Sequence, residues 1–307
     1  MRVDAHLHVF ARASVEFPRE VKPSMPPERE APVEDLLAHM ADHAIDKAVL
    51  VQTGGTSLAH HAYLQHCLRN HPDCFAGIGL IPPDASAVAD HMDRLATDGQ
   101  IIGFRLRSLG GPIDPLQPFD LRQTQTYPIW EHAARQDYVL WLYLQAVDAY
   151  ALPFFLEAFS SVRVVVNHMM VCPGEGQFSW DAKGRPHIDV DMPPETRYST
   201  LGLKIGRIPD NTRGRFPFAN VCIHLSGQYA ISKEAYPHLD LAEWHRNLYA
   251  AFGPERLIWA SDFPWIATDP GYGESVEVLD HLLPELSADE RRQIMGETAR
   301  RFLRLGA

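Results

Sequence analysis

Short apolar runs alternate with amphipathic patterns along most of the chain. Eight runs are rich in Val, Ile or aromatic residues, and several end at Gly, Pro, His or Asp, as buried strands do. They cover residues 2–8, 47–52, 75–81, 103–107, 139–145, 162–168, 220–226 and 257–262. Between most of them, apolar residues recur at helix spacing, which predicts helices at 32–43, 60–70, 85–98, 127–136, 148–159 and 241–252.

Strands that alternate with helices predict parallel strands joined by helical crossovers. Eight such strands favour an α/β fold with a single (β/α)8 TIM barrel. An open doubly wound sheet is the rival, but no Gly-x-Gly-x-x-Gly follows any strand. Two more helices, 273–283 and 287–305, would form a C-terminal extension, and the second begins at a capping box from Ser287 to Glu290. The whole chain, 1–307, is expected to form one domain.

Two segments interrupt this rhythm. Residues 15–31 are rich in proline and charge and predict a loop after the first strand. Residues 171–217 predict a long insertion after the sixth strand, in which 195–208 is a candidate sixth helix. Such an insertion either covers the active-site face or lies at the periphery, and the sequence leaves both open.

The composition narrows the possible partners. Hydrophobic residues form 46% and charged residues 22% of the 307 residues, which is enough to bury a large core. A formal net charge of −11 argues against nucleic acid or an anionic membrane, but not against a small anionic substrate held by a few arginines. The four cysteines form no CxxC pair, which predicts reduced thiols and a cytoplasmic protein. A homo-oligomer remains possible.

The ends of three predicted strands carry the candidate chemistry. His6 and His8 share a face of the first strand, because side chains alternate along it. The sixth strand stops at His168 and the eighth at Asp262. Since all carboxyl ends of a barrel's strands meet at one rim, these four side chains should converge. Three imidazoles and one carboxylate predict a divalent-cation site with room for water.

At this point the chain resembles a known family. DAHLHVF at 4–10, VNHMM at 166–170 and WASDFPW at 259–265 resemble the amidohydrolase superfamily, and GFRLR at 103–107 and IHLSG at 223–227 are similar to strand ends of its amidohydrolase-2 branch. That branch contains 2-pyrone-4,6-dicarboxylate lactonase, sugar-lactone hydrolases and aminocarboxymuconate-semialdehyde decarboxylase. The resemblance spans nearly the whole chain.

The resemblance implies roles for matching residues. His6, His8, His168 and Asp262 would bind one divalent ion, Zn²⁺ or Mn²⁺, or polarise the substrate without a metal. Asp262 would be the general base. No lysine ends a strand where two-metal members carry one, and His224 stands where the sugar lactonases carry lysine. His224 would then be an extra ligand, a proton donor or a substrate contact.

Other polar residues are weaker candidates. Arg105 either pairs with a structural carboxylate or awaits the carboxylate of a substrate. Tyr143 and Gln52 are expected to hydrogen-bond a ligand, although a core role explains Tyr143 equally well. His60, His61, His66 and His71 lie on or after a helix and are interpreted as surface groups.

Three functions are consistent with these residues. The first is hydrolysis of a small carboxylated lactone by water that Asp262 activates. The second is metal-dependent decarboxylation of an unsaturated or aromatic carboxylic acid, with His224 as the acid. The third is a non-catalytic barrel that binds a small acid or stores metal, which four convergent polar groups at a barrel rim disfavour.

Overall fold

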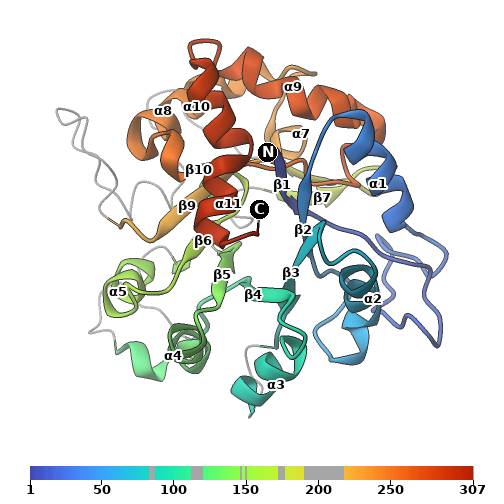
Figure 1. The fold of residues 1–307 in the computed structure, drawn as a ribbon, viewed down its shortest axis with the longest axis vertical. Helices are drawn as coiled ribbons and strands as arrows, with labels where there is room; N and C mark the ends of the chain where they lie inside the picture. The colour runs from blue at the N-terminus through green and yellow to red at the C-terminus, as the bar shows by residue number, and fades with distance from the viewer. Residues whose placement is uncertain are drawn as a thin grey trace.

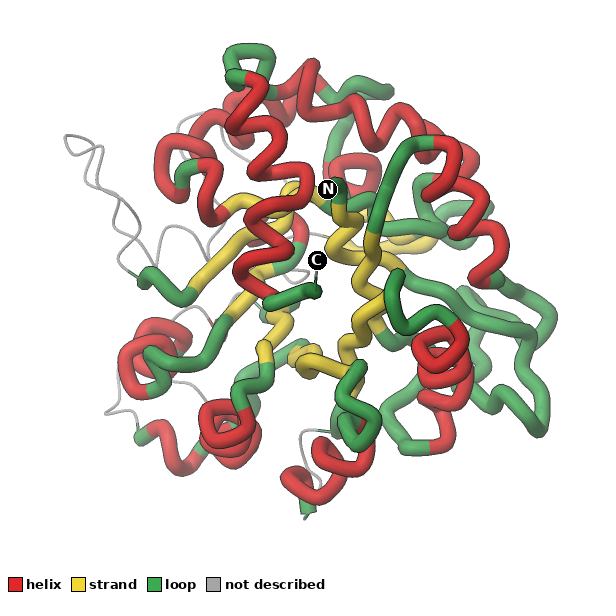
Figure 2. Tube along the Cα trace, viewed as in Figure 1, coloured by secondary structure: helices red, strands yellow, loops and turns green. Residues whose placement is uncertain are grey.

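The structure is a computed structural model that describes residues 1–82, 87–111, 120–145, 147–148, 151–171, 177–189 and 218–306. Eight parallel strands follow one another in the order β1-β2-β3-β4-β5-β6-β9-β10 and form a nearly closed barrel surrounded by helices (Figure 1 and Figure 2). The predicted TIM barrel is confirmed, and each predicted strand overlaps an observed one. The strands are β1 (Val3–Leu7), β2 (Lys47–Val51), β3 (Phe75–Leu80), β4 (Ile101–Leu106), β5 (Val139–Leu142), β6 (Val164–Val166), β9 (Val221–Leu225) and β10 (Leu257–Trp259).

Backbone hydrogen bonds join the carboxyl ends of the first and last strands. The Asp262 N–H donates to the His6 carbonyl oxygen at 3.0 Å, and the His8 N–H donates to the Phe263 carbonyl oxygen at 2.7 Å. These bonds set the two histidines of β1 beside the aspartate that follows β10. Residues from opposite ends of the chain therefore meet at one rim of the barrel.

The helices pack one apolar face against the strands. For example, α1 buries Val33, Leu36 and Met40, which recur at the spacing of one helix face. The helices are α1 (Val33–Asp42), α2 (Ala62–Asn70), α3 (Val88–Leu95), α4 (Tyr127–Gln136), α5 (Leu152–Ala158), α7 (Gln228–Ile231), α8 (Ala242–Phe252), α9 (Tyr272–Leu282), α10 (Ala288–Arg292) and α11 (Thr298–Leu303). None of the helices within the described residues has both the length and the apolar character needed to cross a membrane.

The predicted final helix is interrupted. The capping box at Ser287 and Glu290 starts α10 as expected, but a π-type turn at Gln293–Glu297 separates α10 from α11. The interruption falls at Gly296, where a Cβ atom would lie 2.3 Å from the Met1 carbonyl oxygen. Only glycine allows this close approach to the N-terminal backbone.

The C-terminal helix closes one end of the barrel. Ala299 and Leu303 of α11 pack in the same buried cluster as Val3, Val49 and other barrel residues, and Figure 1 shows α11 lying across the strands. This leaves the opposite end, where the strands finish, for a ligand.

The insertion after β6 contains a hairpin that the sequence analysis did not predict. Strands β7 (Gln177–Trp180) and β8 (Pro186–Asp189) pair antiparallel. Arg29, from the loop after β1, donates to the Gly184 carbonyl oxygen at 2.9 Å. Arg185 Nη1 lies 3.1 Å from Asp269 Oδ2. The hairpin is therefore fixed to two other loops. The candidate helix 195–208, residues 85 and 86 of the predicted helix 85–98, and residues 149 and 150 of the predicted helix 148–159 lie outside the described residues.

Candidate active site

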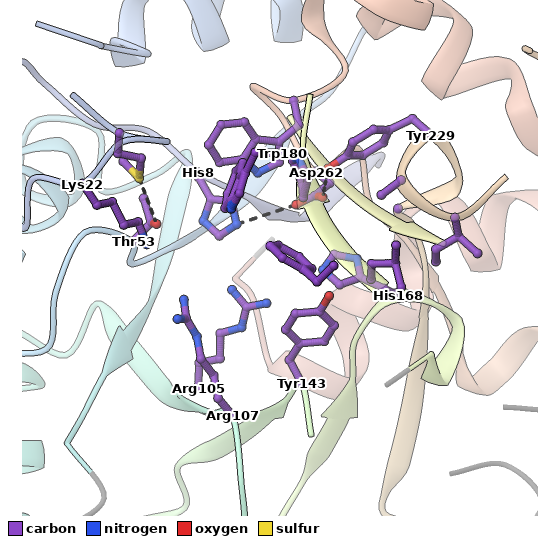
Figure 3. Close-up of a pocket in the computed structure, with 18 of the residues that line it drawn as sticks. His8, Lys22, Thr53, Arg105, Arg107, Tyr143, His168, Trp180, Tyr229 and Asp262 are labelled. Atoms are coloured by element: carbon purple, nitrogen blue, oxygen red, sulfur yellow. Dashed lines mark hydrogen bonds and ion pairs between the residues drawn. The ribbon is translucent and has the colours of Figure 1, made fainter. Parts of the chain in front are cut away.

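A pocket of about 350 Å³ lies at the carboxyl ends of the strands (Figure 3). The β7–β8 hairpin contributes Phe178, Trp180 and Ile188 to its wall, so the described part of the insertion belongs to the pocket and not only to the periphery. Several predicted site residues line it from the strand ends, namely His8, Arg105, Tyr143, His168 and Asp262.

His6 and His8 face the same side at the end of β1, as alternation predicts, but Ala5 and Leu7 do not share the other side. The pairing of β1 with β2 shifts register between Asp4 and Leu7. As a result Ala5 and Leu7 pack in different clusters, although strict alternation would put them on one side. The two imidazole rings still lie with their centroids 5.1 Å apart.

His6, His8 and Asp262 form a cluster of hydrogen-bond acceptors without donors between them. His6 Nε2 and His8 Nε2 each lie 3.6 Å from Asp262 Oδ1, too far for a hydrogen bond. His8 Nδ1–H donates to the Val51 carbonyl oxygen at 2.7 Å, which leaves Nε2 with its lone pair. Among the described residues, His6 Nε2 and Asp262 Oδ1 have no hydrogen-bond partner, although both are buried.

Burial keeps these imidazoles neutral and favours the protonated carboxyl group. Desolvation, helped by the nearby Arg105 charge, lowers the pKa of His8 to about 3 and that of His6 well below its usual range. Desolvation also raises the pKa of Asp262 to about 7, against the hydrogen bond from Tyr229 and the Arg105 charge. Protons are thus easily exchanged at Asp262 near neutral pH.

This cluster fits a divalent cation. Its three ligand atoms lie within 4.8 Å of one another, and the lone pairs of His6 Nε2 and Asp262 Oδ1 lack any other partner among the described residues. Two imidazoles and a carboxylate are a common donor set for Zn²⁺. The Tyr229 hydroxyl donates to Asp262 Oδ2 at 2.7 Å, so Oδ1 is the oxygen left for a cation.

His168 lies beside this cluster. Its ring centroid is 5.0 Å from that of His6, and its Nδ1 is 3.0 Å from Ser226 Oγ. His168 and Asp262 both adopt left-handed backbone conformations, with φ of 46° and 62°. Such conformations cost about 1–3 kcal/mol each and concentrate at functional sites. His168 faces the pocket, but it is not one of the three residues whose ligand atoms group together.

Asn167 is a buried residue that the sequence analysis did not select. Its amide nitrogen donates to the Leu142 carbonyl oxygen at 3.0 Å, and its oxygen accepts from His6 Nδ1–H at 2.9 Å, His224 Nδ1–H at 3.0 Å and Trp141 Nε1–H at 3.2 Å. The opposite amide orientation would leave its oxygen against a carbonyl oxygen. Asn167 therefore favours the Nδ1 proton on both histidines and a lone pair on each Nε2, on His6 in competition with Trp141 Nε1–H, which lies 2.9 Å from the same Nδ1.

His224, the predicted second catalytic residue, lies deeper than the pocket wall. It is fully buried on β9, and its ring centroid is 5.3 Å from that of His6. Burial and the Arg105 charge lower the pKa of His224 to about 3, so its imidazole is neutral. Its Nε2 has no partner among the described residues. It is not among the residues that line the pocket.

Three cations share one side of the pocket. Arg105, Arg107 and Lys22 line it together, and Figure 3 shows the two guanidinium groups side by side. Arg105 is buried, its Nε has no partner among the described residues, and its Cζ lies 5.0 Å from the Tyr143 ring centroid. Burial and the Arg107 charge lower the pKa of Arg105 to about 10, which leaves it charged. This arrangement favours an anionic ligand. Lys22 was missed in the sequence because it lies in the loop after β1.

Gln52, predicted to contact a ligand, is turned toward the loop after β2. It does not line the pocket. Its Nε2 donates instead to the carbonyl oxygens of Thr53 at 2.7 Å and His60 at 2.8 Å, so it holds the loop after β2.

The prediction of a surface position was wrong for one histidine. His61 is fully buried. Its Nδ1–H donates to the Ser57 carbonyl oxygen at 2.8 Å, and its Nε2 accepts from the Leu80 N–H at 3.0 Å. Its short helix packs against the end of β3, and both ring nitrogens satisfy backbone groups there.

Comparison with known families identifies the chain. The sequence profile of the amidohydrolase-2 family, described as amidohydrolase, matches residues 3–305. The chain belongs to this family. The predicted resemblance is confirmed, and this amidohydrolase is an enzyme. None of the curated proteins matches the chain.

Solved structures share the fold of this amidohydrolase. A protein from Acinetobacter baumannii, described as a probable 2-pyrone-4,6-dicarboxylic acid hydrolase with citric acid bound, is 17% identical with a TM-score of 0.70, and 98% of each chain is covered. An amidohydrolase from Burkholderia multivorans with bound zinc is 20% identical with a TM-score of 0.69 over 100% of both chains. The 2,6-dihydroxybenzoate decarboxylase from Rhizobium is 16% identical with a TM-score of 0.61 over 99% of both chains. At these identities the likeness concerns the fold.

Proposed function

We propose that this amidohydrolase hydrolyses a small lactone that carries a carboxylate. The main support is that one pocket is lined by His8 and Asp262 of the acceptor cluster, with His6 Nε2 3.6 Å from Asp262 Oδ1, and by Arg105 and Arg107. The cluster suits activation of a carbonyl group and water, and the guanidinium groups suit a carboxylate.

His6, His8 and Asp262 would hold one divalent cation, with His168 beside them. Bound there, Zn²⁺ or Mn²⁺ would polarise the substrate's carbonyl oxygen and acidify water. The solved structure of a zinc-bound relative with the same fold is consistent with zinc. Asn167 and Tyr229 orient the donor atoms through their hydrogen bonds to His6 and Asp262.

Asp262 would move the proton in this reaction. It accepts a proton from the water that adds to the carbonyl carbon, and it returns the proton to the ring oxygen when the acyl C–O bond breaks. Arg105 fixes the substrate through its carboxylate. The product is an open-chain hydroxy acid, and water is the only other reactant.

Decarboxylation of an unsaturated or aromatic carboxylic acid is the second candidate. The bond to the carboxylate carbon would break, CO₂ would leave, and a proton would replace it on the remaining carbon. His224 favours this reaction, because its buried Nε2 has no partner among the described residues. Its low pKa and its place behind the pocket wall make it a poor proton source, so lactone hydrolysis is preferred.

A weakly buffered pH-indicator assay separates the two reactions. We expect purified protein supplied with Zn²⁺ to acidify solutions of carboxylated lactones, and Asp262→Asn to lower this rate by about 10²–10⁴-fold. Asp280→Asn, at an exposed ion pair with Arg291, is the matched control and should retain full activity. Alkalinisation with unsaturated or aromatic acids, after control for CO₂ hydration, would replace the lactonase proposal by the decarboxylase. Near-normal turnover in Asp262→Asn would reject the role of Asp262.

A further inference from the structure

A second cavity of about 180 Å³ adjoins the main pocket. We call it the side compartment. Lys22, Arg105 and Arg107 line both cavities, and Figure 3 shows all three along one side of the main pocket. These three cations therefore stand at the junction between the two spaces.

Arg105 is built to hold an anionic group at this junction. Its side chain is 5% exposed, and its Nε has no hydrogen-bond partner among the described residues. A buried donor without an acceptor is costly, and a buried charge even more so. A carboxylate of a ligand would supply the missing acceptor and neutralise the repulsion between Arg105 and Arg107.

Beyond the junction, the wall of the side compartment is no longer positively charged. Leu80, Ile81 and Leu106 supply apolar surface, whereas Glu20 supplies a negative charge. An alkyl group there would lie against this apolar part of the wall. A second carboxylate would instead lie near Glu20 and lose hydration over apolar surface.

Two glycines form part of the wall of the side compartment. Gly54 and Gly55 line the compartment in the loop after β2, with φ of 81° and 124°. Both values lie in the region that side-chain-bearing residues rarely adopt. Thr56 follows them and lines the side compartment, whereas Thr53 precedes them and lines the main pocket.

We propose that the side compartment binds a short, uncharged alkyl substituent of the substrate, while Arg105 holds the substrate's carboxylate at the junction. The substrate class is then a carboxylate with an alkyl chain close to the acid group. The inference rests on the proposed function for the position of the reacting group, but the binding itself requires no turnover.

Calorimetric titration of the full-length protein with acetate, butyrate and hexanoate tests this subsite directly. We expect affinity to rise from acetate to hexanoate by up to about fourfold for each methylene that becomes buried. Thr56→Leu narrows the side compartment and should remove this gain while acetate still binds. Thr53→Leu is the matched control, because it narrows only the main pocket and should keep the gain. Thermal unfolding of both variants verifies that they are folded.

Two results would overturn the subsite. They are no gain with chain length in the natural protein, and a gain that persists in Thr56→Leu. If the persisting gain is lost in Thr53→Leu, the alkyl chain lies in the main pocket instead. Adipate carries a second carboxylate at the far end of its chain, so it tests whether the side compartment prefers an uncharged group. Adipate that binds more tightly than hexanoate, and loses this advantage in Thr56→Leu, would place a second anionic group in the compartment. A chain-length gain without any lactone hydrolysis would reject the proposed function and leave the subsite standing.

Discussion

Buried histidines occur in two regions of this amidohydrolase, and the two regions satisfy them differently. In the helical layer, His61 and His245 use both ring nitrogens. His245 Nδ1–H donates to the Leu241 carbonyl oxygen at 2.8 Å, and its Nε2 accepts from Gln228 at 3.1 Å. His61 likewise bonds two backbone groups. Both ring nitrogens of these imidazoles are hydrogen-bonded within the protein, so no lone pair is left for a ligand.

In the barrel mouth, His6 and His224 use only one ring nitrogen. Each donates from Nδ1 to the Asn167 oxygen, and each Nε2 is buried without a partner among the described residues. All four histidines are buried to the same degree, so burial does not distinguish them. The two regions differ instead in whether Nε2 has a hydrogen-bond partner. A buried polar atom without a partner is costly and calls for an explanation, such as a ligand or a metal ion that binds there.

Replacing one buried histidine in each region should give the largest effect, a difference in zinc affinity between the two variants. We expect His6→Gln to weaken Zn²⁺ binding by more than about a hundredfold, above the loss typical of residues that merely support a ligand. His245→Gln is the control. It should leave zinc affinity unchanged and lower the free energy of unfolding by about 1–3 kcal/mol, because it disturbs a satisfied buried group. Competition with a fluorescent zinc chelator measures the affinity, and denaturant unfolding measures the stability. Equal zinc affinity in both variants would contradict the proposed difference between the two groups of histidines.

Asn167 should produce an intermediate effect, since it acts through the histidines. Asn167→Leu removes the shared acceptor and should lower zinc affinity by about 10–100-fold. It should also shift the Nδ1–H tautomer of His6 and His224 toward a mixture, which nitrogen chemical shifts of ¹⁵N-labelled histidines report in the metal-free protein.

Asn220→Leu is the matched control for this effect. Asn220 donates to the Val162 carbonyl oxygen at 2.8 Å, just before β6 and β9 begin, at the opposite end of the barrel. It should change stability without changing the tautomers. If Asn167→Leu changes neither the histidine tautomers nor the zinc affinity, Asn167 contributes only to packing.

Sequence reasoning found those parts of the molecule that depend on local pattern. The barrel strands are mostly apolar and buried on both faces, and β3, β5, β6 and β10 are uninterrupted apolar runs, so their positions could be predicted. His8, His168 and Asp262 were found because each lies at the end of a predicted strand. Asn167 gave the same signal, a polar residue directly after Val164–Val166, but an amide suggests no chemistry until its partners are known.

Long-range contacts decide what local pattern could not predict. Lys22 is brought to the pocket by a loop whose shape depends on Arg19, which donates to the carbonyl oxygens of Met25 at 2.9 Å and Pro26 at 2.6 Å. The β7–β8 hairpin is held by Arg29, which donates to the Gly184 carbonyl oxygen, and by its own Arg185, which pairs with Asp269. Gln52 ends a strand like the true pocket residues, yet its amide turns to the neighbouring loop. No periodicity encodes such contacts.

The pH dependence of zinc binding should show the smallest effect, and its slope tests which group holds the proton. Burial raises the pKa of Asp262 to about 7 and lowers that of His8 to about 3. Only the ionised carboxylate binds a cation, so affinity should fall as pH drops below about 7. One titrating group gives about a tenfold loss per pH unit. Imidazoles with ordinary pKa values would add further protons between pH 6 and 5 and give a steeper loss. Zinc titrations from pH 7.5 to 5.5 distinguish these cases, and a steep slope would mean that the histidines of the barrel mouth are not held neutral by their burial.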